Sequence, residues 1–591
     1  MSLDRITSHI RAVRPLAVLL AICCCLSAVS AQWPGTISAP PDLRPVSSGA
    51  AISTGPPAPS TQSGITIGVV DTVGGTTYDH QVNGPPWRML ANSASRGIYV
   101  VWMYTADTTI YFPDRNMRFN YYDRALQKWV HSDSTDFMSR GVNVFPRRAS
   151  YGSIDVDTGG TPYISSHAVF GGAARPWVAK GVSGNYSDTT LTACAYPPIA
   201  VGRNGAVHVL PYTSQVCSLR YCRIAPDSWP HWSAPLTGIP PNPWSFSQNI
   251  AASKVSDRVS LVWELNAIPG AAYQMQSTDG GRTWDNPAEL APPEAYGGDT
   301  LTGFGIMSLF PFYDRHDRFH IVANLLPVVR DTARVVPSQI WHYCPDNSPE
   351  WSRIHVAGCD PANMKGSLSI VSTYACRPSI GEDRTGGLYV AWEQFDSANV
   401  ETTTSRLRAD IFFAQDSGNN GASWHPSVRL TDQGSWSCRF PSAIDYFGDD
   451  TFRVSYVIDQ QAGYFAGNGL PSEGVATRNP VVVHKVSVAA GIGESRERTA
   501  IGRELSVWPN PFKNNVRISY ELRAVGNVSL QVCDVAGRTV RTLASGFQKP
   551  GTFSVSWDAR DTEGKQVPYG VYLCRLETPG FRSVQKAVVT R

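Results

Sequence analysis

The chain has 591 residues, of which 17% are charged, and its formal net charge at pH 7 is +3. A net charge this small, without a basic run, argues against a nucleic-acid partner. Aromatic residues make up 10%, and 50 Gly and 43 Pro supply turn-forming positions. Few charges, many aromatics and many turn residues predict an all-β protein built from short strands.

Residues 1–31 are predicted to be an export signal, so we expect a secreted protein. Three arginines precede an apolar run over 16–29, and small residues follow it, which places the first mature residue at Gln32. The run is shorter than the about 20 residues of a membrane span, which disfavours a membrane anchor. A lipoprotein is also disfavoured, because bulky Ile22 precedes Cys23. No second apolar segment of spanning length follows, so the mature protein is not expected to be transmembrane.

Nine cysteines follow the predicted signal, and none forms a Cys-x-x-Cys pair. No histidine cluster accompanies them, so the sequence predicts neither a metal site nor a cofactor. An oxidising compartment permits disulfides. We expect at least one bridge among two closely spaced pairs, Cys217–Cys222 and Cys344–Cys359.

Residues 32–65 are rich in Pro, Ser, Gly and Ala and are predicted to be a flexible linker. Residues 66–488 repeat one template, in which a short strand, a tight polar turn and a second strand follow one another. Its clearest copy starts at Arg377-Pro378-Ser379-Ile380 and ends at Trp392. Six other segments fit the template. They are 89–102, 151–164, 196–210, 249–263, 309–322 and 441–456.

The copies recur roughly every 50–70 residues, and a fixed period of this size predicts radial repetition. Seven copies therefore predict a seven-bladed β-propeller. The late strand at 481–486 is expected to close the ring against 65–71. The alternative, two β-sandwiches, explains the even spacing less well.

Two segments match the Asp-box pattern S-x-D-x-G-x-T-W, the second with Asn for Asp and Ser for Thr. An Asp or Asn in a tight turn accepts hydrogen bonds from nearby backbone N–H groups, and glycine adopts the positive φ of such turns. We therefore interpret the boxes as fold-stabilising hairpins, and 122–129 as a decayed copy. Their fixed positions are Ser277, Asp279, Gly281, Thr283 and Trp284 in the first, and Ser417, Asn419, Gly421, Ser423 and Trp424 in the second.

With these boxes, 66–488 resembles the sialidase-like BNR-repeat propellers, a superfamily that includes glycosidases and non-enzymatic binding proteins. Sialidases use an arginine triad for the substrate carboxylate, a Tyr–Glu nucleophile pair and an Asp acid/base. The resemblance makes Arg88, Arg377 and Arg439 candidates for binding an anionic ligand, because each lies near the start of an inner strand. No Arg-Ile-Pro motif and no Tyr–Glu pair can be identified.

The three arginines are one residue out of register, so strand alternation predicts that Arg377 faces away from Arg88 and Arg439. Local pairing or solvent exposure is then the favoured interpretation of these side chains. The acidic stretch 155–160 is compatible with a calcium loop. An inter-strand turn is favoured, because the stretch occupies the same template position as the turn at 383–387.

A second linker is predicted at 489–503, and 504–591 reads as a small β-sandwich of immunoglobulin type. The motifs Trp508-Pro509-Asn510-Pro511-Phe512, Asp534 to Arg538, Trp557 to Asp561 and Pro568-Tyr569-Gly570 occur in that order. They resemble the type A sorting domain of the type IX secretion system and the related Ig-like domain of hook-capping proteins. The resemblance implies delivery to the outer surface of a Gram-negative bacterium, or release from it. A purely structural Ig module is the alternative.

The leading hypothesis is an exported propeller that binds glycans or surface proteins and is delivered by type IX machinery. An exo-glycosidase of sialidase type and a structural adhesion component are the alternatives, so enzymatic activity is left open and no catalytic residue is assigned. A mouth of clustered Arg, Tyr and carboxylates would favour an enzyme. A mouth lined by aromatic residues alone would favour binding.

Overall fold

The computed structural model describes residues 68–488 and 505–590, apart from short gaps. The predicted signal and both predicted linkers lie outside the described residues. The chain divides into two compact units, Met1–Ala490 and Gly491–Arg591. No helix in the described part is long and apolar enough to cross a membrane. The gaps are 83–84, 110, 171, 183, 188–190, 214–217, 241–246, 266–270, 294–300, 305–307, 330–331, 334–335, 370, 432–433, 466–471, 509, 523–525, 535–537, 549–550 and 579–580.

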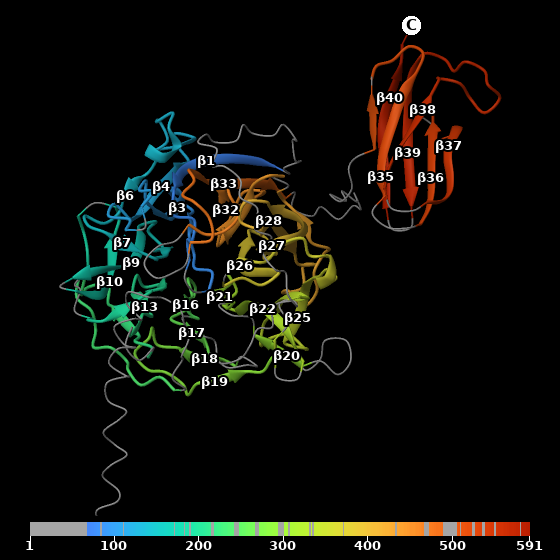
Figure 1. The fold of residues 1–591 in the computed structure, drawn as a ribbon. Coiled ribbons are helices and arrows are strands. Elements are labelled where there is room, and N and C mark those ends of the chain that lie inside the picture. The colour runs from blue at the N-terminus through green and yellow to red at the C-terminus, as the bar shows by residue number, and fades with distance from the viewer. Residues whose placement is uncertain are drawn as a thin grey trace, which may run out of the picture. The chain divides into compact units, whose positions relative to one another are not determined.

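The first unit is a ring of antiparallel sheets that follow one another in chain order, as the colours of Figure 1 show. The first sheet contains β2 (Leu90–Ser93), β3 (Gly97–Tyr104), β4 (Asn116–Asp123), β5 (Lys128–Trp129) and β6 (Val142–Asn143). The second contains β7 (Ala149–Ser150), β8 (Ile154–Val156), β9 (Pro162–Phe170) and β10 (Ala173–Lys180). The next contains β12 (Ile199–Val201), β13 (Val207–Val209) and β15 (Cys222–Ile224), beside the pair β11 (Cys194–Ala195) and β14 (Tyr212–Thr213).

The ring continues with β16 (Gln248–Ala252), β17 (Val259–Glu264), β18 (Ala272–Ser277) and β19 (Ala288–Leu290). After these come β20 (Leu301–Phe304), β21 (Phe310–Tyr313), β22 (Phe319–Val329), β23 (Thr332–Ala333), β24 (Ser338–Tyr343) and β25 (Trp351–Ala357). The following sheet has β26 (Ala375–Asp383), β27 (Leu388–Glu401), β28 (Arg406–Gln415), β29 (Val428–Arg429) and β31 (Tyr446–Phe447). The closing sheet has β30 (Ser437–Ala443), β32 (Thr451–Asp459), β33 (Asn479–Ser487) and β1 (Val69–Thr76). The 3-10 turns are η1 (Phe137–Ser139) and η2 (Pro361–Asn363).

The first strands of the sheets contact one another in sequence around the centre of the ring. The order is β2, β8, β12, β16, β21, β26 and β30, and β31 returns to β2. Strands β3, β16 and β17 are buried along their whole length, so the two sheets that contain them are covered on both faces. A sheet of this kind must bury both faces between neighbours, which the ring allows.

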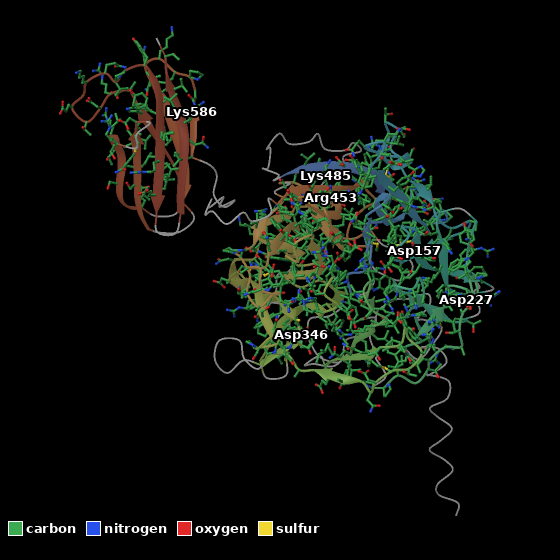
Figure 2. All side chains as sticks on the ribbon, turned by 180° about the vertical axis from the view of Figure 1, so that it is seen from behind. Asp157, Asp227, Asp346, Arg453, Lys485 and Lys586 are labelled. Carbon is green, nitrogen blue, oxygen red and sulfur yellow. The ribbon has the colours of Figure 1, made fainter. Side chains whose placement is uncertain are left out.

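The predicted closure of the ring is confirmed. Strand β1 pairs antiparallel with β33, so that Val69 lies opposite Lys485 and Asp71 opposite Val483. The next strand, β32, places Arg453 opposite Lys485, and Figure 2 shows these two side chains next to each other. The chain therefore closes its ring with strands from both ends of the first unit.

Four inner-strand residues share a left-handed backbone that bends the chain at the mouth of the ring. They are Tyr151, Tyr196, Arg377 and Phe440, with φ of 44°, 52°, 55° and 59°. Each precedes Gly or Pro at the same place in its repeat. A non-glycine residue in this region costs about 1–3 kcal/mol, and such strain gathers at functional sites. The repetition of one strained position around the ring marks the mouth as the place to look for a site.

The second unit is a sandwich of two sheets, as the sequence predicts. One sheet contains β34 (Ser506–Trp508), β35 (Val516–Leu522) and β38 (Gly551–Trp557). The other contains β37 (Thr539–Gln548), β36 (Gly526–Cys533), β39 (Gly570–Thr578) and β40 (Phe581–Val589). Trp557 is fully buried between them and meets Phe512 and Tyr572 edge-on, with ring centroids 5.6 and 5.3 Å away.

The disulfide expectation is wrong for Cys344 and Cys359, which are free thiols. Cys222 is also free, and Cys217 lies outside the described residues. Closeness in sequence was the basis of the expectation, and it does not set the Cβ geometry that a bridge requires.

Candidate functional site

Two arginines meet a single buried carboxylate at the mouth of the ring. Arg377 on β26 and Arg439 on β30 both donate to Oε1 of Glu393 on β27, and the Arg439 distance is 3.0 Å. The other oxygen, Oε2, accepts the backbone N–H of Phe440 at 2.7 Å. Burial alone would raise the pKa of Glu393, but the guanidinium groups of Arg439 and Arg377 lower it to about 2. Glu393 is therefore a permanent anion between two cations.

Aromatic rings enclose this ion cluster. The Tyr464 hydroxyl lies 2.7 Å from Arg439 Nη2, and the Arg439 guanidinium also lies over the Phe395 ring. Arg377 lies over Phe440, 4.7 Å from the ring centroid. Only 3% of Arg377 and 1% of Arg439 is exposed. We call Arg377, Glu393, Arg439 and Tyr464 the closed half of the mouth, because its charges are paired and shielded from solvent.

The expectation that Arg377 faces away from Arg439 is wrong. Both side chains reach the same carboxylate oxygen because the strand alternation is interrupted. The register shifts between Cys376 and Ser379 on β26 and between Arg439 and Ser442 on β30. These shifts coincide with the left-handed residues Arg377 and Phe440.

Arg88 does not join the other two predicted arginines in the contacts of the described residues. Its Nη1 pairs with Asp155 at 3.1 Å and lies 4.0 Å from Asp445. Asp155 also binds the Nζ of Lys254 at 3.0 Å and accepts the backbone N–H of Val201 at 2.7 Å. Arg88 therefore belongs to a structural ion network between neighbouring inner strands.

The part of the mouth next to the closed half holds phenol and imidazole groups that sequence reasoning missed, and His80 packs edge-on against Tyr464 at 4.6 Å. The hydroxyls of Tyr78 and Tyr151 lie 2.6 Å apart, and Nδ1 of His80 lies 3.4 Å from the Tyr151 hydroxyl. Burial, followed by the nearby charge of Arg377, lowers the pKa of His80 to about 3. Burial also raises the pKa of Tyr151 well above its usual range. These groups are neutral at physiological pH.

His167 on β9 is the partly exposed member of this group. Its Nδ1 accepts the backbone N–H of Tyr196 at 3.3 Å, which leaves the ring proton of the neutral form on Nε2. Burial, together with Arg115 and Arg148, lowers the pKa of His167 to about 3. Tyr196 packs edge-on against His167 at 4.9 Å and stacks on Tyr212. His167 therefore presents a neutral N–H donor among aromatic rings.

Three arginines surround a cavity of about 200 Å³ in this part of the mouth. Arg115, Arg147 and Arg148 line it together with Ser150 and His167. The guanidinium of Arg115 lies 5.4 and 5.8 Å from the ring centroids of Tyr78 and Tyr151.

Within the described part of the chain, no carboxylate pairs with any of the three arginines. Arg148 instead donates through Nε to the Phe112 carbonyl at 3.0 Å, and Arg147 lies over the Phe170 ring. We call Arg115, Arg147, Arg148, His167 and Tyr151 the open half of the mouth.

Two carboxyl groups lie buried near the mouth, where they bind the backbone of Gln461 and Phe465. Both oxygens of Asp79 accept the backbone N–H of Phe465 at 2.9 Å, and Asp459 accepts that of Gln461 at 3.1 Å. Burial raises the pKa of Asp459 to about 8 and that of Asp79 well above its usual range. These acids position backbone and are 1–2% exposed, so they do not present a carboxylate to a ligand.

The Asp-box residues lie in turns on the outer strands. The Asp279 carboxylate accepts the N–H groups of Arg282 and Thr283, both at 2.9 Å, and the Thr283 hydroxyl at 2.7 Å. Ser277 Oγ accepts the N–H of Gly281 at 2.8 Å. Trp284 meets Tyr221 of the preceding sheet edge-on at 4.7 Å.

The second box follows the same plan. Asn419 Oδ1 accepts the N–H of Ser423 at 3.0 Å, and its Nδ2 donates to the Ser423 hydroxyl. Gly421 N–H bonds to Asp416, and Trp424 Nε1 donates to Ser352 Oγ at 3.1 Å. In both boxes the polar atoms serve the turn and the Trp contacts the preceding sheet.

The stretch 155–160 forms the inter-strand turn between β8 and β9, in which Asp157 Oδ1 accepts the N–H of Thr161 at 2.7 Å. Elsewhere in the described residues, Asp314, His316 and Glu382 bring possible ligand atoms within 4.8 Å of one another. Their carboxylates already pair with Arg318 and Arg315. The positive charges of Arg318 and Arg315 at this position disfavour the binding of a metal cation there.

Comparison with known proteins identifies the second unit. Residues 512–579 match the family of the FlgD Ig-like domain. The C-terminal sandwich is an Ig-like domain of this kind. No curated protein matches the chain.

Solved structures similar to the first unit are propellers, several of them glycan-active enzymes. An ulvan lyase of polysaccharide lyase family PL25 aligns with 11% identity over 72% of this chain and 96% of its own, with a TM-score of 0.42. The Trypanosoma rangeli sialidase aligns with 10% identity over 85% and 84%, with a TM-score of 0.33. The propeller domain of the Pyrococcus furiosus trilobed protease aligns with 8% identity over 70% and 100%, with a TM-score of 0.34. At these identities the likeness concerns the fold alone.

Proposed function

We propose that the propeller binds an acidic glycan in the open half of the mouth and cleaves it. The observation that carries this proposal is the set of three arginines around one cavity with no carboxylate partner among the described residues. Guanidinium groups recognise carboxylates and sulfates through charge-assisted hydrogen bonds. The rings of Tyr151 and Tyr196 pack on His167 next to the cavity, where they add apolar surface of the kind that a sugar ring requires.

The chemistry available in the mouth favours elimination over hydrolysis. Glycoside hydrolysis uses two carboxyl groups that flank the scissile bond. Among the described residues, the carboxyl groups of Glu393, Asp79, Asp459 and Glu473 lie near the mouth, and each is bonded to protein partners. Elimination instead requires a cation to neutralise a uronate carboxylate and neutral groups that transfer protons.

In that reaction the C5–H bond of the uronate breaks. The proton passes to a base, and the electron pair of the bond forms the C4=C5 double bond. The bond from C4 to the glycosidic oxygen breaks, and this oxygen takes up a proton. We propose that Arg115 faces the uronate carboxylate, and that the Tyr151 hydroxyl oxygen takes up the C5 proton while its own proton passes to the glycosidic oxygen. His167 Nε2–H donates a hydrogen bond to the same carboxylate, so the phenol is neutral before and after the step. A sialidase-type reaction is less favoured, since Glu393 already occupies Arg377 and Arg439.

The test is to incubate the full chain with polyuronates and with sulfated glycuronans. Unsaturated uronate is followed by its ultraviolet absorbance, and new reducing ends are counted in parallel. We expect both signals to rise together. Arg115→Gln should lower kcat/KM about a hundredfold, as loss of a charge-stabilising donor typically does. Arg203→Gln, which removes a surface arginine paired with Asp257, is the matched control. Reducing ends without absorbance would indicate a hydrolase, and binding without either signal would indicate a binding propeller.

We also propose that the Ig-like unit directs the protein through a type IX secretion system. The support is the order of its four motifs and the domain match at 512–579. Fusing residues 504–591 to a periplasmic reporter in a bacterium that has this system should move the reporter to the cell surface or the medium. A reporter that stays in the periplasm would favour the structural-module alternative.

A further inference from the structure

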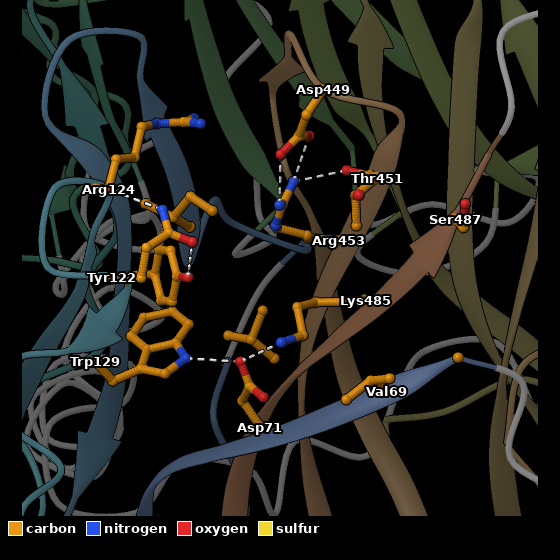
Figure 3. A pocket seen from close by; sticks show the side chains of 14 residues that line it. Val69, Asp71, Tyr122, Arg124, Trp129, Asp449, Thr451, Arg453, Lys485 and Ser487 are labelled. Carbon is orange, nitrogen blue, oxygen red and sulfur yellow. Dashed lines mark hydrogen bonds and ion pairs between the residues drawn. The ribbon is translucent and has the colours of Figure 1, made fainter.

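A second cavity lies away from the mouth, between the outer strands of the closing sheet and of the first sheet. Its volume is about 410 Å³, within the range of small-ligand sites. Figure 3 shows its two walls, with Trp129 and Tyr122 on one side and Lys485 and Arg453 on the other. We call this cavity the seam groove, because it follows the seam where the ring closes.

The closing-sheet wall is charged, but its charges are paired. Cross-strand partners share a face of a sheet, so Lys485 and Arg453 face the groove together, and Asp71 faces it two residues along from Val69. Lys485 Nζ lies 2.9 Å from Asp71 Oδ2, and Arg453 pairs with Asp449 through two contacts of 2.7 and 2.8 Å. This wall therefore offers fixed donors and acceptors with almost no net charge.

The opposite wall combines aromatic rings with the polar side chains of Arg124 and Gln127. Ile98, Tyr122 and Trp129 lie directly across from one another on β3, β4 and β5 and share one face. Trp129 meets Tyr122 edge-on at 5.7 Å, and its Nε1 donates to Asp71 Oδ2 at 2.9 Å across the groove. The indole thus orients the acceptor that also binds Lys485.

The turn before Trp129 contains no glycine, unlike the equivalent turns of the two Asp boxes. In the two Asp boxes, a glycine lets the turn touch the preceding sheet. A Cβ at Gly281 would lie 1.8 Å from the Tyr221 hydroxyl, and one at Gly421 would lie 2.4 Å from the His342 ring. The equivalent turn at 124–127 has Leu126 and Gln127 instead, and Leu126 is 59% exposed.

We propose that the seam groove is a second saccharide site, separate from the mouth, and that it takes a neutral sugar. Sugar hydroxyls both donate and accept hydrogen bonds, which the paired Asp71–Lys485 and Asp449–Arg453 groups can satisfy at the same time. The apolar face of a pyranose packs on an aromatic ring such as that of Tyr122. An acidic sugar would compete with Asp71 and Asp449 for Lys485 and Arg453. The third cation of the lining, Arg124, donates to the Asn92 amide oxygen at 2.7 Å.

The test is binding of neutral oligosaccharides of glucose, galactose, mannose, xylose and rhamnose to the full chain, measured by calorimetry or an immobilised-glycan array. The key variant is Ser487→Trp, which fills the groove from an exposed position without removing any of its contacts. Val255→Trp adds the same bulk at a 44% exposed position outside the groove. We expect at least one neutral probe to bind, with affinity reduced tenfold or more by Ser487→Trp and unchanged by Val255→Trp.

Arg115→Gln separates this proposal from the one for the mouth, because it should leave neutral-sugar binding intact while it lowers cleavage of acidic glycans. Melting temperatures of all three variants exclude misfolding as the cause of any loss. The proposal is overturned if none of the neutral probes binds. It is also overturned if Ser487→Trp binds like the wild type, or if Arg115→Gln abolishes the neutral binding.

Discussion

The two halves of the mouth contain the same kind of residue in opposite electrostatic states. In the closed half, Arg377 and Arg439 share the Glu393 carboxylate and are almost completely buried. In the open half, Arg115, Arg147 and Arg148 line a cavity without an acidic partner among the described residues. The comparison teaches that an arginine near a propeller mouth predicts a ligand only when no carboxylate of the protein already occupies it.

The largest expected effect comes from Glu393→Gln, which removes the anion but keeps the shape of the closed half. Two buried guanidinium groups would then repel each other without compensation, and breaking such a pair costs about 3–5 kcal/mol. Arg377→Ala should also destabilise the fold, because it leaves Glu393 with one cation fewer. Urea unfolding measures both, with Glu289→Gln at an exposed position as the control. If the urea midpoint of Glu393→Gln equals that of the wild type, the ion cluster of the closed half does not stabilise the fold.

Acid should weaken the ring through its neutral histidines. His80 and His167 have a pKa of about 3 in the folded protein, against about 6.5 when unfolded. At these two histidines the folded state therefore binds fewer protons, so their contribution to stability is complete above pH 6.5 and declines as the pH falls toward 3. Glu393 adds a loss of the same sign between about pH 4.5 and 2. The raised pKa values of Asp459 and Asp79 act in the opposite direction below about pH 8, so the histidine contribution is measured as a difference between variants. Unfolding free energies at pH 7 and pH 4.5 measure the decline.

In this pH series, His167→Gln should make the decline shallower. The same substitution at exposed His425 is the control and should leave the decline as it is. The same change in unfolding free energy between pH 7 and 4.5 for His167→Gln and for the wild type would contradict the burial of this imidazole in the folded state.

The Asp box at 277–284 should affect stability but not the mouth. Trp284→Ala is expected to cost about 2–3 kcal/mol, less than a fully buried Trp, because its ring is partly exposed. Asp279→Ala should cost about 1 kcal/mol by leaving turn N–H groups without their acceptor. Melting curves paired with glycan cleavage assays test both. If Asp279→Ala abolishes cleavage without changing the melting temperature, a functional site lies near the outer strands instead.

The smallest effect on stability should come from Arg147→Gln in the open half. This variant tests whether an unpaired arginine contributes to ligand affinity rather than to stability. Arg147 is exposed and contacts the Phe170 ring, so its loss should change stability by less than about 0.5 kcal/mol. The affinity of the variant for acidic glycans should nevertheless fall severalfold. Isotherms with a polyuronate measure this, beside Arg384→Gln on the surface, which should bind normally. Equal affinities for the two variants would remove Arg147 from the proposed site.

Much of the fold could be predicted from the sequence, because the strand–turn–strand template recurs and each strand has its own hydrophobic pattern. The pairing of β1 with β33 and the Ig-like sandwich follow from such local patterns. The meeting of Arg377 with Arg439 could not be predicted by alternation, since left-handed residues interrupt it. A signal was nevertheless present, because Arg377, Phe440 and Tyr196 each precede a proline at the same template position.

The residues of the open half could not be predicted to lie together, for a different reason. Arg147 and Arg148 precede the short strand β7, and Arg115 precedes β4, so none of them lies within the repeated template. His80 and Tyr78 follow β1 outside any repeat. Their proximity depends on how the loops of the first two sheets fold over the mouth, which no period in the sequence encodes.

The pairing of β1 with β33 also sets when the ring can form during synthesis. The two strands come from opposite ends of the first unit, so their contact has a very large sequence separation, and such contacts form late. Until the segment Asn479–Ser487 has left the ribosome, β1 has no partner and the edge of β32 is unpaired. Open edges of this kind recruit other chains. We therefore expect chains truncated before Asn479 to aggregate rather than to accumulate as a soluble, partly closed ring.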